Sequence, residues 1–241
     1  MTADSLTARR RSPLCHLADQ LAAAGSPGAV RLAELPFQTL VEVRCGGADS
    51  LHASRPGLGA SADSHAAVIG RLADIVGLPF PRRVGEVAGA GSRHVLWLGP
   101  DWWLASGPPE PCPDPGLEAE LAGRLRSAAA CQASVVDLSA HFTTLELSGP
   151  RARAVLAHGC SLDLHPRAFG AGRCAQTMVA KAQAVLHQVA EIPAASYRIL
   201  VRASFADYFA RWLLDAMLEY TTADGEAVGG SRGIAHRGYT Q

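Results

Sequence analysis

Residues 135–150 read VVDLSAHFTTLELSGP and combine two strand patterns with the start of a helix. Residues 135–139 and 143–147 are rich in apolar and β-branched residues, as strands are. Ser148 is expected to cap the helix that follows, because a serine hydroxyl can accept a hydrogen bond from a free amide of the first helical turn. Two strands that run directly into a helix favour an α+β architecture.

Downstream, the sequence continues with three further strand patterns and a closing helix. Residues 177–181 and 185–189 have strand composition. From 197 to 202, Tyr197, Ile199 and Val201 alternate with Arg198, Leu200 and Arg202. Ser204 and Asp207 have the spacing of a capping box, with Asp in place of the usual Glu. The stripe that follows has helical spacing and is predicted to lie in the core: Phe205, Tyr208, Phe209, Trp212, Leu213, Ala216 and Met217.

Upstream, the patterns indicate one strand, two helices and a hairpin. A half-buried strand is predicted within residues 30–44, and an amphipathic helix follows near residues 68–76 and stops at Gly77. Residues 93–98 and 102–105 flank the turn residues of a hairpin. Leucines four residues apart predict a second helix, with Leu117, Leu121 and Leu125 on one face.

These elements predict an α+β architecture made of two related strand and helix modules. The first module is expected at residues 30–130 and the second at residues 131–220. An N-terminal arm at residues 1–29 precedes them, and a flexible C-terminal tail at residues 221–241 follows. The tail is assigned because Gly, Ser, Thr and Arg dominate it, with little apolar content to bury.

Composition places the chain among soluble globular proteins. Its 241 residues carry 22 Lys and Arg against 22 Asp and Glu, so a role in binding the nucleic-acid backbone is not expected. No stretch approaches the roughly 20 apolar residues of a membrane span, and no secretory signal is recognised, so we expect a cytoplasmic location. Lys181 is the only lysine; the preference for Arg suits interfaces, although a GC-rich genome explains it equally well.

The cysteines predict neither a metal centre nor a disulfide framework. All 6 are scattered without a C-x-x-C pair, so reduced thiols are expected. The nearest approach to a ligand set is His158, Cys160, His165 and Cys174, and its spacing matches no known first shell of ligands.

Two patterns suggest catalysis, and neither meets its geometric requirement. Asp137, Ser139 and His141 would alternate on one face of a strand, but such neighbours stand roughly 7 Å apart, too far for a hydrogen-bonded triad. Hydrogen bonding at the end of a strand is the favoured interpretation. Lys181 lies in a strand pattern without signs of the burial that activates a lysine. No catalytic, cofactor-binding or metal-binding residue is therefore predicted.

Several segments resemble known proteins. Three resemble the folate-binding module of the glycine-cleavage T-protein, an aminomethyltransferase: residues 135–142, 147–156 and 159–164. Others are similar to the gamma subunit of bacterial heterotetrameric sarcosine oxidase: residues 12–14, 98–104, 160–169, 174–177, 180–183 and 202–208. The similarity is nearly continuous from about Val135 to Met217.

This resemblance implies a noncatalytic structural subunit with an aminomethyltransferase-like fold. The enzyme complex would oxidise sarcosine to glycine and produce hydrogen peroxide with formaldehyde or 5,10-methylenetetrahydrofolate. The implied partners are the alpha, beta and delta subunits. FAD, FMN, NAD and tetrahydrofolate would be carried by other subunits, with no cofactor in this chain.

One departure from the T-protein pattern bears on function. The T-protein has an acidic pair after two apolar strand residues, whereas here His187 and Gln188 follow Val185 and Leu186. Neither side chain can replace a fixed carboxylate, so the fold is expected to persist without the T-protein's acid. A free-standing folate-dependent one-carbon transferase, or a folate-binding module, remains the alternative. Whether Trp97, Trp102 and Trp103 pack in the core or at an interface is open.

Overall fold

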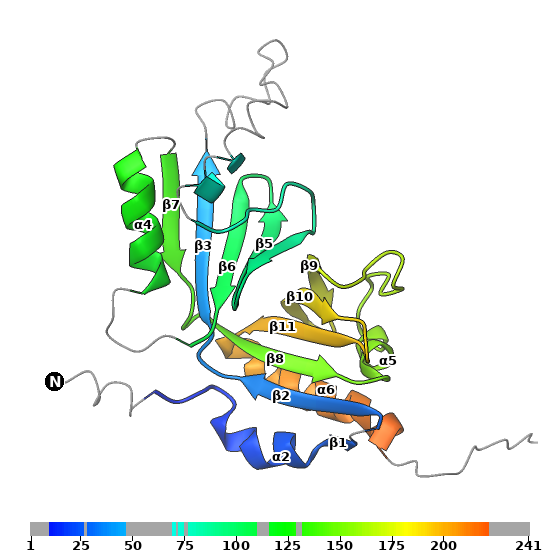
Figure 1. Ribbon diagram of the computed structural model, residues 1–241. Coiled ribbons are helices and arrows are strands. Elements are labelled where there is room, and N and C mark those ends of the chain that lie inside the picture. The colour runs from blue at the N-terminus through cyan, green and yellow to red at the C-terminus, as the bar shows by residue number, and fades with distance from the viewer. Residues whose placement is uncertain are drawn as a thin grey trace, which may run out of the picture.

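The computed structural model describes residues 10–26, 28–46, 69–70, 72–74, 77–109, 116–128 and 132–221. Two antiparallel sheets form the framework, and the strands of one run across the direction of β2, β8 and β11 in the other (Figure 1). The six-stranded sheet contains, in spatial order, β1 (Gly25–Ser26), β2 (Val30–Leu35), β8 (Phe142–Ser148), β11 (Ser196–Arg202), β10 (Ala182–Ala190) and β9 (Arg173–Val179). The five-stranded sheet contains β4 (Val87–Ala90), β5 (Arg93–Gly99), β6 (Trp102–Gly107), β3 (Thr39–Gly46) and β7 (Gln132–Asp137).

Helical segments connect and cover the strands. They are η1 (Cys15–Leu17), α2 (Ala18–Ala23), α4 (Leu117–Ala128), α5 (Ala152–Ala157), η2 (Ala203–Phe205) and α6 (Ala206–Thr221). Residues 69–70 and 72–74 are also helical, and Gly77 follows them with a positive φ of 71°. None of the helices in the described ranges is long and apolar enough to cross a bilayer.

The mixed α and β composition is confirmed, but the sheets do not divide at residue 130. The strand expected within residues 30–44 is two strands, because Pro36 and Phe37 turn the chain and Phe37 adopts a φ of 59°. Of these, β2 pairs with β8 in the six-stranded sheet, whereas β3 pairs with β7 in the other. Each sheet therefore takes a strand from both sides of residue 130, and the kinship of the two modules stays a prediction.

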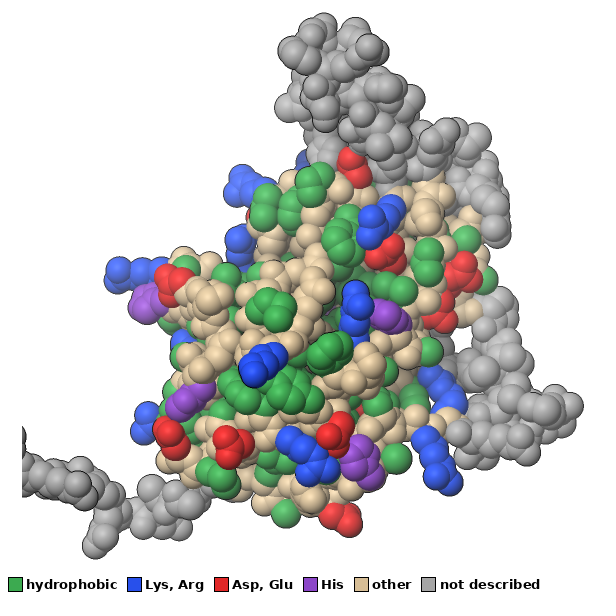
Figure 2. Space-filling view, turned by 180° about the vertical axis from the view of Figure 1, so that it is seen from behind, with side chains coloured by type: hydrophobic (Ala, Val, Ile, Leu, Met, Phe, Trp, Pro, Cys, Tyr) green, Lys and Arg blue, Asp and Glu red, His purple; other side chains and the backbone are tan. Residues whose placement is uncertain are grey.

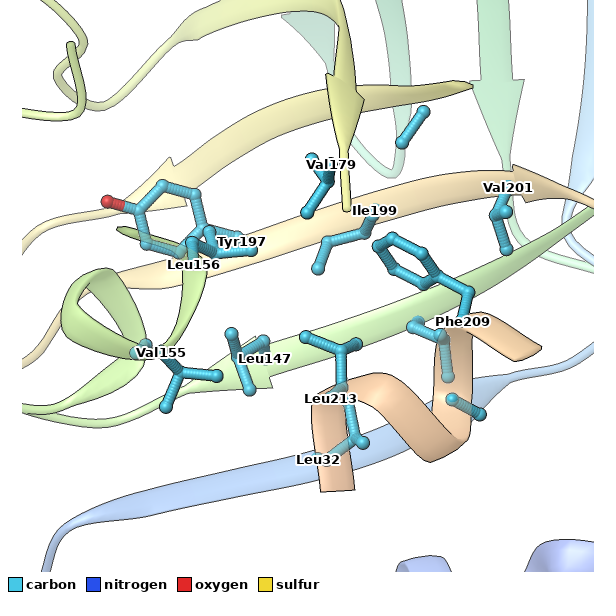
Figure 3. Packing of buried hydrophobic residues seen from close by; sticks show 14 of the residues in the cluster. Leu32, Leu147, Val155, Leu156, Val179, Tyr197, Ile199, Val201, Phe209 and Leu213 are labelled. Atoms are coloured by element: carbon cyan, nitrogen blue, oxygen red, sulfur yellow. The ribbon is translucent and has the colours of Figure 1, made fainter. Parts of the chain in front are cut away.

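The largest core lies between the six-stranded sheet and the helices α2, α5 and α6. Figure 3 shows Phe209 and Leu213 of α6 pointing toward Leu147 of β8 and Ile199 of β11. The predicted stripe is correct for Phe209, Leu213 and Met217, which are fully buried. It is wrong for Phe205 and Tyr208, which are 46% and 39% exposed. Phe205 lies in the 3-10 turn before α6, and Tyr208 lies outside the buried face of α6.

The segment expected to be an N-terminal arm contributes to this same core where it is described. Leu14, Leu17 and Leu21 are buried against the six-stranded sheet and α6. His16 Nε2 also lies 2.7 Å from Asp207 Oδ1 at the start of α6. Residues 1–9 lie outside the described part of the chain, as does most of the predicted tail, residues 222–241.

The two predicted helix caps are wrong. Ser148 ends β8, and α5 begins after Arg151 without a hydrogen bond from a side chain at its N-cap. Asp207 does not complete a capping box with Ser204, because its carboxylate accepts hydrogen bonds from His16 and Arg211. Charged partners nearby therefore replace the expected bonds to backbone amides.

A second core lies on the outer face of the five-stranded sheet, and a third lies between the sheets. Leu117 and Leu121 of α4 pack with Ile69, Leu72 and Trp103 in the second core, as the leucine spacing predicts. The third core consists of Leu40, Leu96, Leu104, Cys174, Val185 and Leu200, and we call it the seam. Because the seam holds the two sheets together, it sets which side chains of one sheet face those of the other at each end of the contact.

Candidate functional site

The suggested triad does not form. β7 ends at Asp137 and β8 begins at Phe142, so Ser139 and His141 lie in the connecting turn and the three residues do not alternate along one strand. Ser139 Oγ donates to Asp137 Oδ1 at 2.5 Å and also accepts a hydrogen bond from the Leu40 amide at 3.0 Å. His141 instead packs edge-on against Phe142, with ring centroids 4.8 Å apart. Ser139 and Asp137 thus fasten a turn to β3, as the favoured interpretation holds.

The cysteines and histidines considered as metal ligands do not come together. His158 contacts Tyr220 in the last turns of α6, and His165 Nδ1 accepts a hydrogen bond from the Arg167 amide. Cys174 lies in the seam, where its thiol donates to backbone carbonyls of Glu86 and Trp97. Within the described ranges no group of three His, Cys, Asp or Glu side chains is placed to hold a metal ion.

Lys181 has a different setting from the one expected, and the three tryptophans do not share one setting. Lys181 lies exposed in the two-residue turn between β9 and β10, not within a strand. Trp103 is a core residue, fully buried with its ring edge-on to Phe80 at 5.5 Å. Trp97 is half-buried against the second core, and Trp102 is half-buried between the sheets.

Polar side chains gather at both ends of the seam. On the face of β10 that meets the other sheet, Gln183 and His187 flank Val185. On the same face of β11, Arg202 and Arg198 flank Leu200. Side chains on one face of a strand recur every second residue. The apolar seam is therefore flanked by Gln183 and Arg202 at one end and by His187 and Arg198 at the other.

At one end of the seam a cavity of about 260 Å³ opens between the sheets. Arg44 stacks over the Trp102 ring, with Cζ 4.3 Å from the centroid, and its Nε pairs with Glu42 at 2.8 Å. Trp102 Nε1 donates to the same carboxylate at 2.8 Å. Leu98, Phe142 and Arg202 are among the other lining residues. This end pocket combines an aromatic wall with paired charges, a composition suited to binding rather than to nucleophilic chemistry.

At the other end of the seam three basic side chains meet, and we call them the basic cluster: His94, His187 and Arg198. His94 extends from β5 and His187 from β10, with ring centroids 5.6 Å apart. Arg198 lies opposite His187 in the register of β10 and β11. Gly89 makes room for His94, because a Cβ there would lie 3.1 Å from His94 Cδ2.

The electrostatics of the basic cluster are dominated by burial and by one permanent charge. His187 is 4% exposed, and burial, with the positive charges of His94 and Arg198, lowers its pKa to about 3. Burial and then Arg198 also lower the pKa of His94, while the nearby Ser92 backbone acts in the opposite direction. Both imidazoles are therefore neutral at pH 7, and Arg198 carries the charge of the cluster.

Sequence reasoning identified the unusual His187 but missed Arg198, His94 and the end pocket. The alternation of residues 197–202 predicted a strand with one buried face and one solvated face. Its second face in fact meets another sheet, which the sequence of β11 alone does not show. A polar–apolar–polar pattern on alternate residues of both β10 and β11 was the available signal.

The fold and these sites define a two-sheet α+β protein whose candidate sites are suited to binding. Residues 58–219 match the family described as "Sarcosine oxidase, gamma subunit family". A sarcosine oxidase subunit gamma of Arthrobacter sp. is 39% identical over 217 residues, which cover 90% of this chain and 94% of that protein. The corresponding protein of Corynebacterium sp. (strain P-1) is 40% identical over 218 residues, with the same coverage. The chain belongs to the sarcosine oxidase gamma subunit family.

Solved structures agree with both resemblances found in the sequence. A chain of the heterotetrameric sarcosine oxidase from Corynebacterium sp. U-96 has a TM-score of 0.70 and 39% identity, covering 90% of this chain and 99% of that one. The glycine cleavage system aminomethyltransferase T from Bartonella henselae has a TM-score of 0.55 at 13% identity, covering 84% of this chain and 56% of that one. The second similarity shows the fold alone.

Proposed function

We propose that this chain is the noncatalytic structural gamma subunit of a heterotetrameric sarcosine oxidase. The observation that carries the proposal is the identity of about 40% that extends over nine-tenths of this chain and of proteins named sarcosine oxidase subunit gamma. A similarity along almost the whole of both chains favours the same place in the same kind of assembly, because interface residues as well as core residues are included.

The state of the polar side chains supports a structural role. Ser139 and Asp137 are engaged in a turn, and burial raises the pKa of the Cys174 thiol to about 12, so it does not ionise at neutral pH. A neutral thiol is a poor nucleophile. His187, with a pKa near 3, is a weak base. These groups therefore support the fold and the seam better than they would support a reaction.

The expected partners are the alpha, beta and delta subunits, which would carry FAD, FMN, NAD and tetrahydrofolate. In this proposal the assembled enzyme converts sarcosine to glycine and passes the one-carbon unit to tetrahydrofolate or releases it as formaldehyde, with hydrogen peroxide as the other product. Exposed apolar side chains on this chain offer contact surface, among them Val136, Met178, Ile192 and Phe205. Figure 2 shows such apolar side chains interspersed with single charges of both signs, which suits a protein interface.

The test is co-expression of the full chain with the three candidate partners, and of the partners without it. We expect the tagged chain to retain a yellow complex that forms peroxide from sarcosine, and the partners alone to assemble poorly. Recovery of the chain without flavin-bearing partners would contradict the proposal. Tight binding of tetrahydrofolate by the isolated chain, with one-carbon transfer, would favour the transferase instead. A cytoplasmic location belongs to the same proposal and is tested by cell fractionation.

A further inference from the structure

The basic cluster at the junction of the two sheets carries the positive charge of Arg198. Arg198 forms no ion pair among the described residues, and its Nε is buried without a hydrogen-bond partner. The acidic residue facing it in register is Glu146 of β8, yet the two side chains do not form an ion pair. A buried guanidinium nitrogen without an acceptor is unfavourable and indicates a missing partner.

The two histidines also have few hydrogen-bond partners among the described residues, apart from the Ser92 backbone near His94. His187 is buried and makes no side-chain hydrogen bond, and Nδ1 of His94 has no hydrogen-bond partner. Their rings are in contact, with centroids 5.6 Å apart and planes tilted by 58°, so side chains from two different sheets form one continuous surface there. Gly89 opposite His94 leaves the space that its ring occupies.

We propose that His94, His187 and Arg198 form a binding site for a small oxyanion, a carboxylate or phosphate group held by the Arg198 guanidinium beside the two imidazole rings. A guanidinium presents paired donors that match the two oxygens of such a group. Each imidazole can donate one N–H in its neutral form and two when protonated. A bound anion would thus satisfy the orphaned nitrogens together.

A cation is the wrong occupant for this cluster. Arg198 acts on both rings and disfavours any further positive charge there. A metal ion would meet the same repulsion and would find only two imidazole ligands. This inference does not depend on the proposed function, because the site is formed by side chains of this chain alone.

The test measures binding of radiolabelled inorganic phosphate to the full-length chain by equilibrium dialysis at constant ionic strength. Wild-type chain is expected to bind one phosphate saturably, and Arg198→Gln to weaken binding about tenfold or more. The matched control is Arg167→Gln, which removes an exposed arginine away from the basic cluster and from the end pocket and should leave binding unchanged. Glu146→Gln should tighten binding, because it removes the opposing carboxylate from the same face.

Competition identifies which anion is preferred. Displacement of phosphate by acetate at similar concentration assigns the site to carboxylates, whereas displacement by sulfate alone assigns it to tetrahedral oxyanions; both support the proposal. Equal weakening in Arg198→Gln and Arg167→Gln, or no saturable binding of phosphate or acetate, would overturn it.

A second measurement on the unaltered chain avoids dependence on how the variants fold. Phosphate should shift the ring nitrogen signals of His94 and His187 in nuclear magnetic resonance spectra, and raise the pH at which they titrate. The exposed ring of His165 should not respond. Unchanged signals for His94 and His187 at saturating phosphate would refute the site.

Discussion

Acid should destabilise this protein through His187. The folded chain holds the pKa of His187 at about 3, chiefly by burial and then by the charges of His94 and Arg198, whereas an unfolded histidine titrates near 6.5. Between these values the unfolded chain binds a proton that the folded chain does not, so stability falls as the pH falls. The free energy of unfolding should decrease by about 2 kcal/mol from pH 7.5 to pH 5, and by about 3 kcal/mol at pH 4.

The groups that face His187 all act in the same direction or stay neutral in this range. Arg198 on β11 is permanently charged, and His94 on β5 has its own lowered pKa, which adds to the loss of stability in acid. Cys174, opposite His187 on β9, remains a neutral thiol because its pKa is raised to about 12. The window for the effect therefore lies below pH 6.5.

Urea unfolding of the full chain measures this effect, in buffers free of oxyanions that could occupy the basic cluster. His187→Gln keeps a polar side chain but cannot be protonated, so its loss of stability from pH 7.5 to pH 5 should be about 2 kcal/mol smaller than that of the wild type. His165→Gln removes an exposed imidazole and should leave the wild-type pH dependence in place. An identical acid response in wild type and His187→Gln would refute the reasoning.

Three other substitutions test the packing and the turns. Phe209→Ala should lower the free energy of unfolding by about 3–5 kcal/mol in urea, because its fully buried ring leaves a cavity under the six-stranded sheet. Gly149→Ala should destabilise more than Gly172→Ala in the same assay: both have positive φ, but only at Gly149 would a Cβ lie 2.5 Å from a backbone oxygen, that of Ala29. Lys181→Ala should leave sarcosine-dependent peroxide formation by the assembled complex unchanged, since the side chain is exposed in a turn.

Local sequence patterns predicted helices and hairpins correctly where a single local effect, such as apolar spacing or a turn residue, determines the structure. The four-residue step of Leu117 and Leu121 identified α4, and the turn residues at Pro100 and Asp101 identified the β5–β6 hairpin. Predictions failed where a tertiary partner competes with a local one. Ser204 and Asp207 have the spacing of a cap, but Asp207 binds His16, 191 residues away in the sequence.

The assignment of strands to sheets is the part that the sequence could not supply. Pro36 and Phe37 divide the strand expected within residues 30–44, and nothing local shows that β2 and β3 then diverge into different sheets. The pairings of β2 with β8 and of β3 with β7 join segments about a hundred residues apart. Such contacts depend on which faces the rest of the chain leaves open, not on propensity.

The polar ends of the seam follow from the same topology. β10 and β11 are antiparallel neighbours, so Val185 faces Leu200 and His187 faces Arg198. Their outer face is covered by the helices of the largest core, while their inner face meets β5 and β6 only along the apolar seam. At one end of this inner face, the described strands of the second sheet cover His187 and Arg198 but offer their side chains no hydrogen-bond acceptor. Within the described ranges Arg198 therefore lacks an ion pair because of how the two sheets cross. The partial burial of Arg198 strengthens the interaction of its guanidinium with an entering anion and fixes where that anion binds.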